Sequence, residues 1–169
     1  FLKNFGTRRE EGDENIPPSI SRADNEMYRD GVVLCADICN TRLTFDIKKK
    51  SRIKYINLLE VFGIDPEKAD HRMNEIIQLS NIAHDYRIPS WIVPHSVYSL
   101  SLSLFSLLRK ETESNKITSV HFMETEAEKS FLKYHDGPIL ESYKESGLAV
   151  EGLETVEDHA SAVLEEITP

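Results

Sequence analysis

The chain has 169 residues, of which 40% are hydrophobic and 29% are charged, and its formal net charge is −9. This length is enough to bury one hydrophobic core, so we expect a single globular domain. The negative charge argues against nucleic-acid binding and against docking on anionic lipid, because both partners select basic surfaces. No apolar run reaches the roughly 20 residues that cross a bilayer, so no membrane segment is predicted.

The two cysteines, Cys35 and Cys39, lie four positions apart. No second pair is present to complete a zinc site, and two thiols do not make a disulfide framework. We expect Cys35 to be a small buried side chain within a strand. A reducing, cytoplasmic setting fits this use of cysteine, and the first residues lack the apolar core of a signal peptide.

Four apolar segments are predicted to be strands that alternate with helices. Residues 1–18 are charged, end in two prolines and are predicted to be a loop or linker, after which Ser19 or Ser21 can cap a helix that stops at Gly31. The first strand reads "VVLCADI", a nearly continuous apolar run that indicates burial on both faces. The predicted strands cover residues 32–38, 53–62, 90–96 and 116–122.

The helices are predicted from apolar spacing and from their start and stop residues. Asp65 and Pro66 open a long helix, which should fade near Tyr86 because Pro89 disfavours helical geometry just before it. The predicted helices cover residues 45–51 and 66–86, a segment that starts at 101 or 103, residues 124–135, and two stretches after 137 that are split by Gly147 and Gly152.

Strands that alternate with helices form right-handed crossovers and a parallel sheet. In such folds ligands bind at the carboxyl ends of the strands. Asp37, Glu60, His95 and His121 each fall at or near the end of a predicted strand. The sequence therefore predicts a ligand site formed by these strand ends.

His121 and Glu124 are the strongest candidates for chemistry. A neutral imidazole at a strand end can bind a divalent metal, and a nearby carboxylate can take a proton from water and return it to a leaving group. The alternative is a histidine that bonds to a neighbouring carbonyl, with Glu124 and Glu126 as charges at a helix N-terminus.

The sequence allows two interpretations of the role of His95 and two of the role of Glu60. His95 is surrounded by hydroxyl side chains and is either a pocket residue that contacts a substrate or a hydrogen-bonded loop histidine. Burying the carboxylate of Glu60 within a strand costs free energy unless the group is paired or takes part in the function of a site. The alternative is that Glu60 faces solvent or pairs with a lysine. Asp37 is either a site residue or a turn former.

Several common catalytic motifs are absent from the sequence. No glycine-rich phosphate loop follows a strand, and no G-x-S-x-G elbow occurs. Neither cysteine has a histidine in a plausible neighbouring motif. Nucleotide-cofactor and acyl-transfer functions are therefore not indicated.

The stretches "PHSVY" (residues 94–98) and "HFMET" (residues 121–125) resemble paired motifs of the metal-dependent amidohydrolase superfamily. The similar branch is the chlorohydrolase and aminohydrolase group, which includes deaminases. There P-H-S-x-Y ends the fourth strand and H-x-x-E-T ends the fifth. The segments "ADNEMYRDGVVLCADICNT" and "NLLEVFGIDPEKA" also resemble the second and third strand regions of that group, so the resemblance covers residues 20–146.

The resemblance implies an α/β fold that is part of a TIM (β/α)8 barrel, with strands two to five in residues 19–146 and a helical tail, 147–169, leading to a missing sixth strand. It implies that His121 is a metal ligand and that Glu124 is the catalytic acid and base. His95, together with Glu60, would contact the substrate. The implied cofactor is a divalent transition metal, zinc or iron, in the parent protein.

The sequence lacks other parts of the family pattern, namely the first-strand H-x-H pair, the sixth-strand histidine and the eighth-strand aspartate. Together with the start at Phe1, this leads us to expect the middle of a longer hydrolase that acts on C–N or C–Cl bonds of a small heterocycle, an aminohydrolase by preference. The isolated chain is expected to be inactive and to hold metal weakly or not at all, because tight sites need several converging ligands. We expect its partners to be a heterocyclic amine or halide and the rest of its own barrel, with self-association through exposed strand edges.

Two other functions remain open at this stage. One is a non-catalytic α/β module with a doubly wound sheet that binds a small ligand or a protein. The other is an amidohydrolase-like domain that has lost its metal ligands and works through protein contacts. Strand order separates the first from a barrel, because a doubly wound sheet reverses direction at a switch point.

Overall fold

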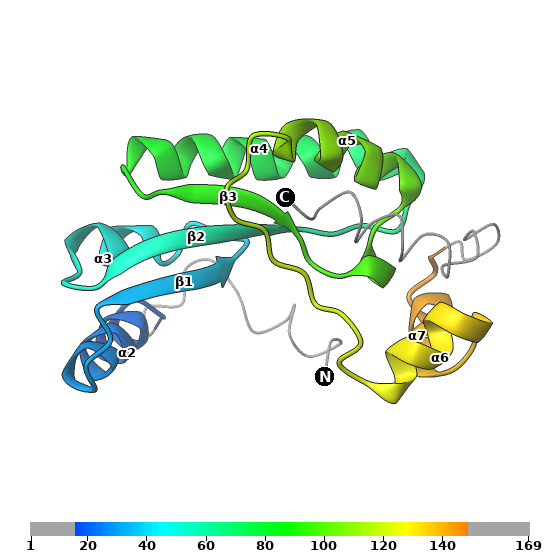
Figure 1. Ribbon diagram of the computed structural model, residues 1–169, viewed down its shortest axis with the longest axis horizontal. Helices are drawn as coiled ribbons and strands as arrows, with labels where there is room; N and C mark the ends of the chain where they lie inside the picture. The colour runs from blue at the N-terminus through cyan, green and yellow to red at the C-terminus, as the bar shows by residue number, and fades with distance from the viewer. Residues whose placement is uncertain (1–15, 149–169) are drawn as a thin grey trace.

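A parallel sheet with its strands in chain order forms the centre of the computed structural model, which describes residues 16–148 (Figure 1). The strands are β1 (Leu34–Cys39), β2 (Lys54–Val61) and β3 (Ser90–Pro94). β2 lies between the other two and pairs in parallel with both. The helices are α2 (Ile16–Arg29), α3 (Phe45–Lys50), α4 (Ala69–Asp85), α5 (Leu102–Thr112), α6 (Glu126–Tyr134) and α7 (Pro138–Glu145), with short 3-10 turns at Pro66–Lys68 and Val97–Ser99.

The hydrophobic core lies between the sheet and the two helices α4 and α5. Figure 1 shows both helices along one side of β2 and β3, and both contact these strands. On α4 the buried residues Ala69, Met73 and Ile76 follow the helical spacing predicted from the sequence. On β2, Leu59 and Val61 alternate toward the same core. This layer fixes the strands whose ends carry the candidate site.

Helix ends follow the start and stop residues in the sequence. The side chain of Asp65 accepts a hydrogen bond from the backbone N–H of Glu67 at 3.0 Å, just before the Pro66 turn that leads into α4. The Ser101 hydroxyl accepts from Leu104 N–H at 3.2 Å at the start of α5. Gly31 adopts φ +94°, a left-handed conformation that favours glycine, directly after α2. These three predicted boundaries are confirmed.

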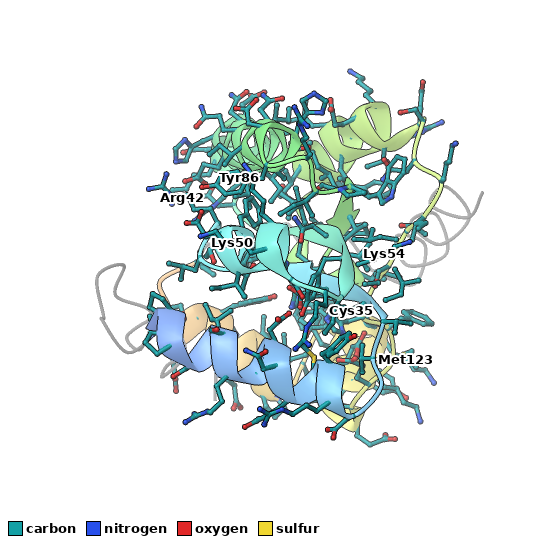
Figure 2. The ribbon with its side chains drawn as sticks, turned by 90° about the vertical axis from the view of Figure 1, so that its left-hand side faces the viewer. Cys35, Arg42, Lys50, Lys54, Tyr86 and Met123 are labelled. Atoms are coloured by element: carbon teal, nitrogen blue, oxygen red, sulfur yellow. The ribbon has the colours of Figure 1, made fainter. Side chains whose placement is uncertain are left out.

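Helix α2 is anchored beside α3 by one carboxylate. Asp24 accepts hydrogen bonds from the Ser51 hydroxyl at 2.6 Å and from the Tyr55 hydroxyl at 2.9 Å. Figure 2 shows α2 and α3 as neighbouring helices on this side of the molecule. The burial of the Tyr55 hydroxyl and its bond to Asp24 raise the pKa of that phenol.

The predicted boundary after residue 18 is wrong by a few residues. Helix α2 begins at Ile16, so Pro17 and Pro18 lie in its first turn, where a missing N–H has no intrahelical partner to lose. Of the two helical stretches predicted after residue 137, the one before Gly147 is α7, whereas residues 149–169 of the predicted tail lie outside the described residues.

The prediction that the first strand is buried on both faces is also wrong. Exposed and half-buried residues alternate along β1, and Leu34 is 59% exposed. Among the described residues β1 is an edge strand, so it has one neighbour only, β2. Its apolar residues Leu34 and Ile38 share a face that the described part of the chain leaves open.

Three of the four predicted strands are present in the part of the chain that the structure describes. The segment 116–122 meets the sheet at one isolated parallel bridge, between Ser96 and His121. Along the edge of β3 the carbonyl of Ile92 instead accepts a bond from the Asn115 side chain at 2.8 Å, and Pro94 has no N–H to offer. Side-chain pairing and proline therefore take up positions that a fourth strand would use.

Candidate functional site

The carboxyl ends of β2 and β3 bring Glu60 and His95 to one place. In the sheet register Glu60 pairs with Val93, and the backbone N–H of His95 donates to the carbonyl of Val61 at 3.1 Å. Glu60 is only 8% exposed, in spite of its carboxylate. A buried carboxylate at a strand end requires a compensating partner.

His121 supplies that partner from a distant part of the chain. Its backbone N–H donates to the carbonyl of His95 at 2.8 Å, and the centroids of the two imidazole rings lie 5.1 Å apart. Its Nε2 lies 3.2 Å from Oε1 of Glu60. The strand-end glutamate is therefore paired with a histidine rather than with a lysine.

The other ring nitrogen of His121 faces a second carboxylate. Nδ1 lies 2.8 Å from Oε1 of Glu124, which follows on the same loop. The hydrogen bond with Glu124 raises the pKa of His121, and the carboxylate of Glu60 acts in the same direction. The His121 ring thus bridges a buried carboxylate and the 55% exposed side chain of Glu124.

Burial shifts the pKa values of the other two groups. It raises the pKa of Glu60, a shift that the nearby His121 partly opposes. It lowers the pKa of His95, and the neighbouring charge of His121 adds to this effect. His95 therefore favours the neutral form that can ligate a metal or accept a proton.

Hydroxyl groups orient the His95 ring. Its Nδ1 lies 3.1 Å from the Ser99 hydroxyl and 3.2 Å from that of Ser96, which leaves Nε2 as the nitrogen for a ligand. The ring of Phe62 packs edge-on against His95, with the centroids 5.7 Å apart. Two of the hydroxyls expected around His95, those of Ser96 and Ser99, contact its ring, and the contact with Phe62 was not predicted from the sequence.

These residues fit a divalent metal. Glu60, His95 and His121 each offer one ligand atom, and the three atoms lie within 4.8 Å of one another. Two imidazole nitrogens and one carboxylate oxygen are the donor set of catalytic zinc sites that keep an open position. The pairing of His121 with Glu124 on its other nitrogen is the arrangement that orients ligand histidines in such sites.

The site residues predicted from the sequence thus include four that the structure brings together, namely Glu60, His95, His121 and Glu124. Glu126, the other acidic residue in the alternative reading, lies in the first turn of α6, where it pairs with Lys129 at 3.6 Å.

Asp37 does not join this cluster. It pairs in register with Asn57, whose side chain lies on the opposite face of β2 from Glu60 because faces alternate along a strand. There Asp37 forms an ion pair with the buried ammonium of Lys48 on α3. The expectation that four strand ends would share one site is therefore wrong for Asp37.

Two charged residues near these strands were missed by sequence reasoning. Glu128 is 1% exposed and bonds to the backbone of the loop that carries Glu124. The spacing from Thr125 to Glu128 is that of a capping box, a signal that was present in the sequence. Lys48 is buried against Asp37 and Asn57, and its position among other lysines gave no signal.

A cavity of about 450 Å³ borders the site. It lies between the loop after β1 and one flank of α4, and Glu60 is the member of the cluster that lines it. Its wall includes the guanidinium groups of Arg42 and Arg72. It also includes apolar side chains, among them Phe62, Ile76, Leu79 and Ile82. Its size is that of a small-molecule pocket.

Within residues 16–148, none of the helices combines the length and the apolar character needed to cross a bilayer.

Known structures share this fold. No family model matches the sequence, and no curated protein matches it either. Aminofutalosine deaminase from Helicobacter pylori superimposes with a TM-score of 0.65 at 20% identity, over 76% of this chain and 33% of that one. The same enzyme in complex with methylthio-coformycin gives a TM-score of 0.66 at 22% identity, over 78% and 33% of the two chains.

The chain spans about a third of the length of these deaminases. At this level of identity the likeness shows the fold. It confirms the α/β arrangement expected from the resemblance to metal-dependent amidohydrolases, with three parallel strands in consecutive order. About three quarters of this chain is therefore similar in fold to about one third of an aminofutalosine deaminase.

Proposed function

We propose that this chain is part of a metal-dependent hydrolase that removes an amino group from a small heterocycle by attack of water, with removal of a halide as the related reaction. The observation that carries the proposal is the position of His121. Its ring lies between the carboxylates of Glu60 and Glu124 and beside the ring of His95, at the carboxyl ends of parallel strands.

His121 is the proposed metal ligand. In this chain Glu60 and His95 are near enough to complete a set of three ligands, which supports weak binding. In a longer parent that supplies further ligands, Glu60 and His95 contact the substrate instead. When bound, a divalent transition metal supplies the Lewis acidity that makes a water molecule nucleophilic at neutral pH.

Glu124 is the proposed acid and base. Its carboxylate is half exposed and is held at 2.8 Å from the His121 ring, so it lies at the edge of the site, where a water molecule can reach it. It takes a proton from the attacking water and returns that proton to the departing amine, whereas a halide leaves as the anion and the proton passes to solvent. One carboxylate serves both steps because it accepts a proton in the first step and gives it up in the second.

His95 is proposed to contact the reacting ring. Burial lowers its pKa, so it is neutral near pH 7, and the hydroxyls of Ser96 and Ser99 fix its Nδ1 side. Its Nε2 is then free to meet an oxygen or nitrogen of the substrate. A fixed neutral imidazole can stabilise charge that develops there during attack.

The proposed substrate is a small heterocyclic amine. The structure of the Helicobacter pylori deaminase with methylthio-coformycin supports a small molecule as the ligand of this fold. The free thiols of Cys35 and Cys39 support a reducing, cytoplasmic setting.

The test uses the longest natural polypeptide that contains this chain. It is incubated with amino-substituted and chloro-substituted purines, pyrimidines and triazines, while released ammonia and chloride are measured. We expect ammonia release that falls by about 100-fold or more in Glu124→Gln, because general acid–base catalysis contributes that much. Glu126→Gln, which removes the same charge from an exposed site two residues away, is the matched control and should keep full activity. Equal activity of both variants would exclude Glu124 as the acid and base.

A non-catalytic binding module is the second candidate. A doubly wound sheet would reverse its strand order at a switch point, whereas the order here is β1-β2-β3. Three strands in consecutive order also fit one half of a doubly wound sheet, so it is the likeness to the deaminase fold that favours part of a barrel. Tight binding of a heterocycle by the natural polypeptide without turnover would favour the module instead.

The open face of the sheet supports a further partner, the rest of a barrel. Val33, Leu34 and Ile38 expose large apolar side chains at β1, which is an edge strand among residues 16–148. We expect the isolated chain to be inactive and to self-associate through these surfaces. Light scattering should show species larger than a monomer, and a monomer at high concentration would contradict this expectation.

A further inference from the structure

Glu128 is the most deeply buried carboxylate among the described residues, with 1% of its surface exposed. Its two oxygens accept hydrogen bonds from two consecutive backbone N–H groups. Oε1 accepts from Met123 at 2.8 Å, and Oε2 accepts from Glu124 at 2.8 Å. One side chain thus holds both peptide groups that lead into the residue proposed as the acid and base.

This geometry extends beyond an ordinary capping box. In that motif the glutamate at the third helical position bonds to the N–H of the N-cap residue, here Thr125. The reciprocal half is present, because the Thr125 hydroxyl accepts from Glu128 N–H at 3.1 Å. The carboxylate, however, reaches the two residues before the N-cap. It therefore fixes the loop that precedes α6 as well as the end of the helix.

The loop contains a backbone conformation that needs support. Met123 has φ +57°, in the left-handed region that a side chain disfavours. Such a conformation persists when surrounding contacts determine it. The bond from Met123 N–H to Glu128 is one contact of this kind, and it is shielded from water by the burial of Glu128.

The fixed loop sets the position of Glu124 relative to His121. The backbone N–H of Glu124 donates a hydrogen bond to Glu128, and the side-chain Oε1 of Glu124 lies 2.8 Å from Nδ1 of His121. We propose that Glu128 is a positioning residue that holds Glu124 against His121 through the backbone of Met123 and Glu124. The catalytic role of Glu124 and His121 rests on the proposed function, whereas the hydrogen bonds from Glu128 to the loop do not depend on it.

The variant that tests this is Glu128→Gln. It keeps the shape of the side chain but turns an N–H group toward one of the two backbone donors. The matched control is Glu126→Gln in the same first turn of α6, which removes the same charge from an exposed side chain. Two signals are measured by NMR in the isotope-labelled chain: the exchange rates of the Met123 and Glu124 amides, and the ring N–H signal of His121.

We expect Glu128→Gln to speed exchange of both amides by about tenfold or more, because each donor now lacks a charged acceptor. The hydrogen-bonded ring N–H signal of His121 should weaken, as it should in Glu124→Gln. Glu126→Gln should leave both signals unchanged. Unchanged amide exchange and an unchanged His121 signal in Glu128→Gln would overturn the inference.

A second measurement requires no variant. Scalar couplings across hydrogen bonds, from the amide nitrogens of Met123 and Glu124 to the carboxyl carbon of Glu128, should be present in the natural sequence. Their absence would overturn the inference even where Glu128→Gln fails to fold.

Activity separates this inference from the proposed function. In the natural polypeptide Glu128→Gln should lower kcat with little change in KM, because it displaces the acid and base and spares substrate contacts. If the natural polypeptide is inactive but the couplings are present, the proposed function is wrong and the positioning role of Glu128 is supported. If the natural polypeptide is active and its kcat is unchanged in Glu128→Gln, the positioning role of Glu128 is wrong and the proposed function is supported.

Discussion

The imidazole rings of His95 and His121 lie 5.1 Å apart, and the backbone N–H of His121 donates to the carbonyl of His95 at 2.8 Å. No strand ladder among the described residues joins the two segments, which meet at the single bridge between Ser96 and His121. Their alignment therefore depends on that bridge and on the carboxylates of Glu60 and Glu124 that flank the His121 ring.

Replacing Lys48 should destabilise the fold. Its ammonium is buried on α3 against the carboxylate of Asp37 and the amide oxygen of Asn57, and it lies over the ring of Tyr55, 5.5 Å from the centroid. Lys48→Met removes one partner and leaves the others short of a donor, so the free energy of unfolding should fall by about 2 kcal/mol. The value lies below that for a fully buried pair because Asp37 is 35% exposed. Urea unfolding measures the change.

The control for that variant is Lys50→Met at the exposed end of the same helix, where Lys50 is labelled in Figure 2. It should change the free energy of unfolding by less than about 0.5 kcal/mol. Equal losses in the two variants would mean that the buried ion pair contributes nothing specific.

Arg87→Gly should stabilise the protein. Arg87 follows α4 with φ +60°, and its N–H donates to the His84 carbonyl at 2.8 Å, while Ile88 N–H donates to Ala83 at 3.1 Å. This is a Schellman ending, in which glycine is the favoured residue. The gain should be about 0.5 to 1 kcal/mol in thermal or urea unfolding.

Arg87→Ala is its comparison, because it removes the same side chain and keeps the left-handed cost. It should not stabilise the protein. A glycine variant no more stable than the alanine variant would show that the backbone at this position carries no strain worth relieving.

Cys39 should react slowly with alkylating reagents. Burial raises the pKa of its thiol from an ordinary value of 9.0 to about 11, with Lys48 acting in the opposite direction. The thiolate is the nucleophile, so at pH 8 the reaction should be about 100-fold slower than for an ordinary cysteine. A raised pKa also means that the rate keeps rising about tenfold per pH unit beyond pH 9. Iodoacetamide labelling of a Cys35→Ser variant, followed by mass spectrometry, isolates Cys39, and a rate that levels off near pH 9 would contradict the raised pKa.

The sequence predicted those parts of the fold that depend on local patterns. Asp65, Ser101 and Gly31 mark helix boundaries because each satisfies a local backbone requirement. The strand ends at Glu60 and His95 were predicted for the same reason, since a buried apolar run gives way there to an ionisable group.

The parts that failed depend on contacts between distant residues. Asp37 was expected at the site, but strand register places it on the face of the sheet that meets Lys48. The expected fourth strand is reduced to one bridge, and the Asn115 side chain bonds to the Ile92 carbonyl at the edge of β3. Neither the face of a strand end nor such a side-chain contact can be read from the apolar pattern of one segment.

The central claim is that His121, Glu60 and His95 together can hold one divalent transition metal. The direct measurement is titration of the chain with Co²⁺, followed by visible absorption, in the natural sequence, in His121→Ala and in His84→Ala, which changes an exposed histidine of α4. We predict weak binding of one ion per chain, with a spectrum of nitrogen and oxygen ligands that is lost in His121→Ala and kept in His84→Ala. Binding that survives in His121→Ala, or no binding to the natural sequence at all, would contradict the claim.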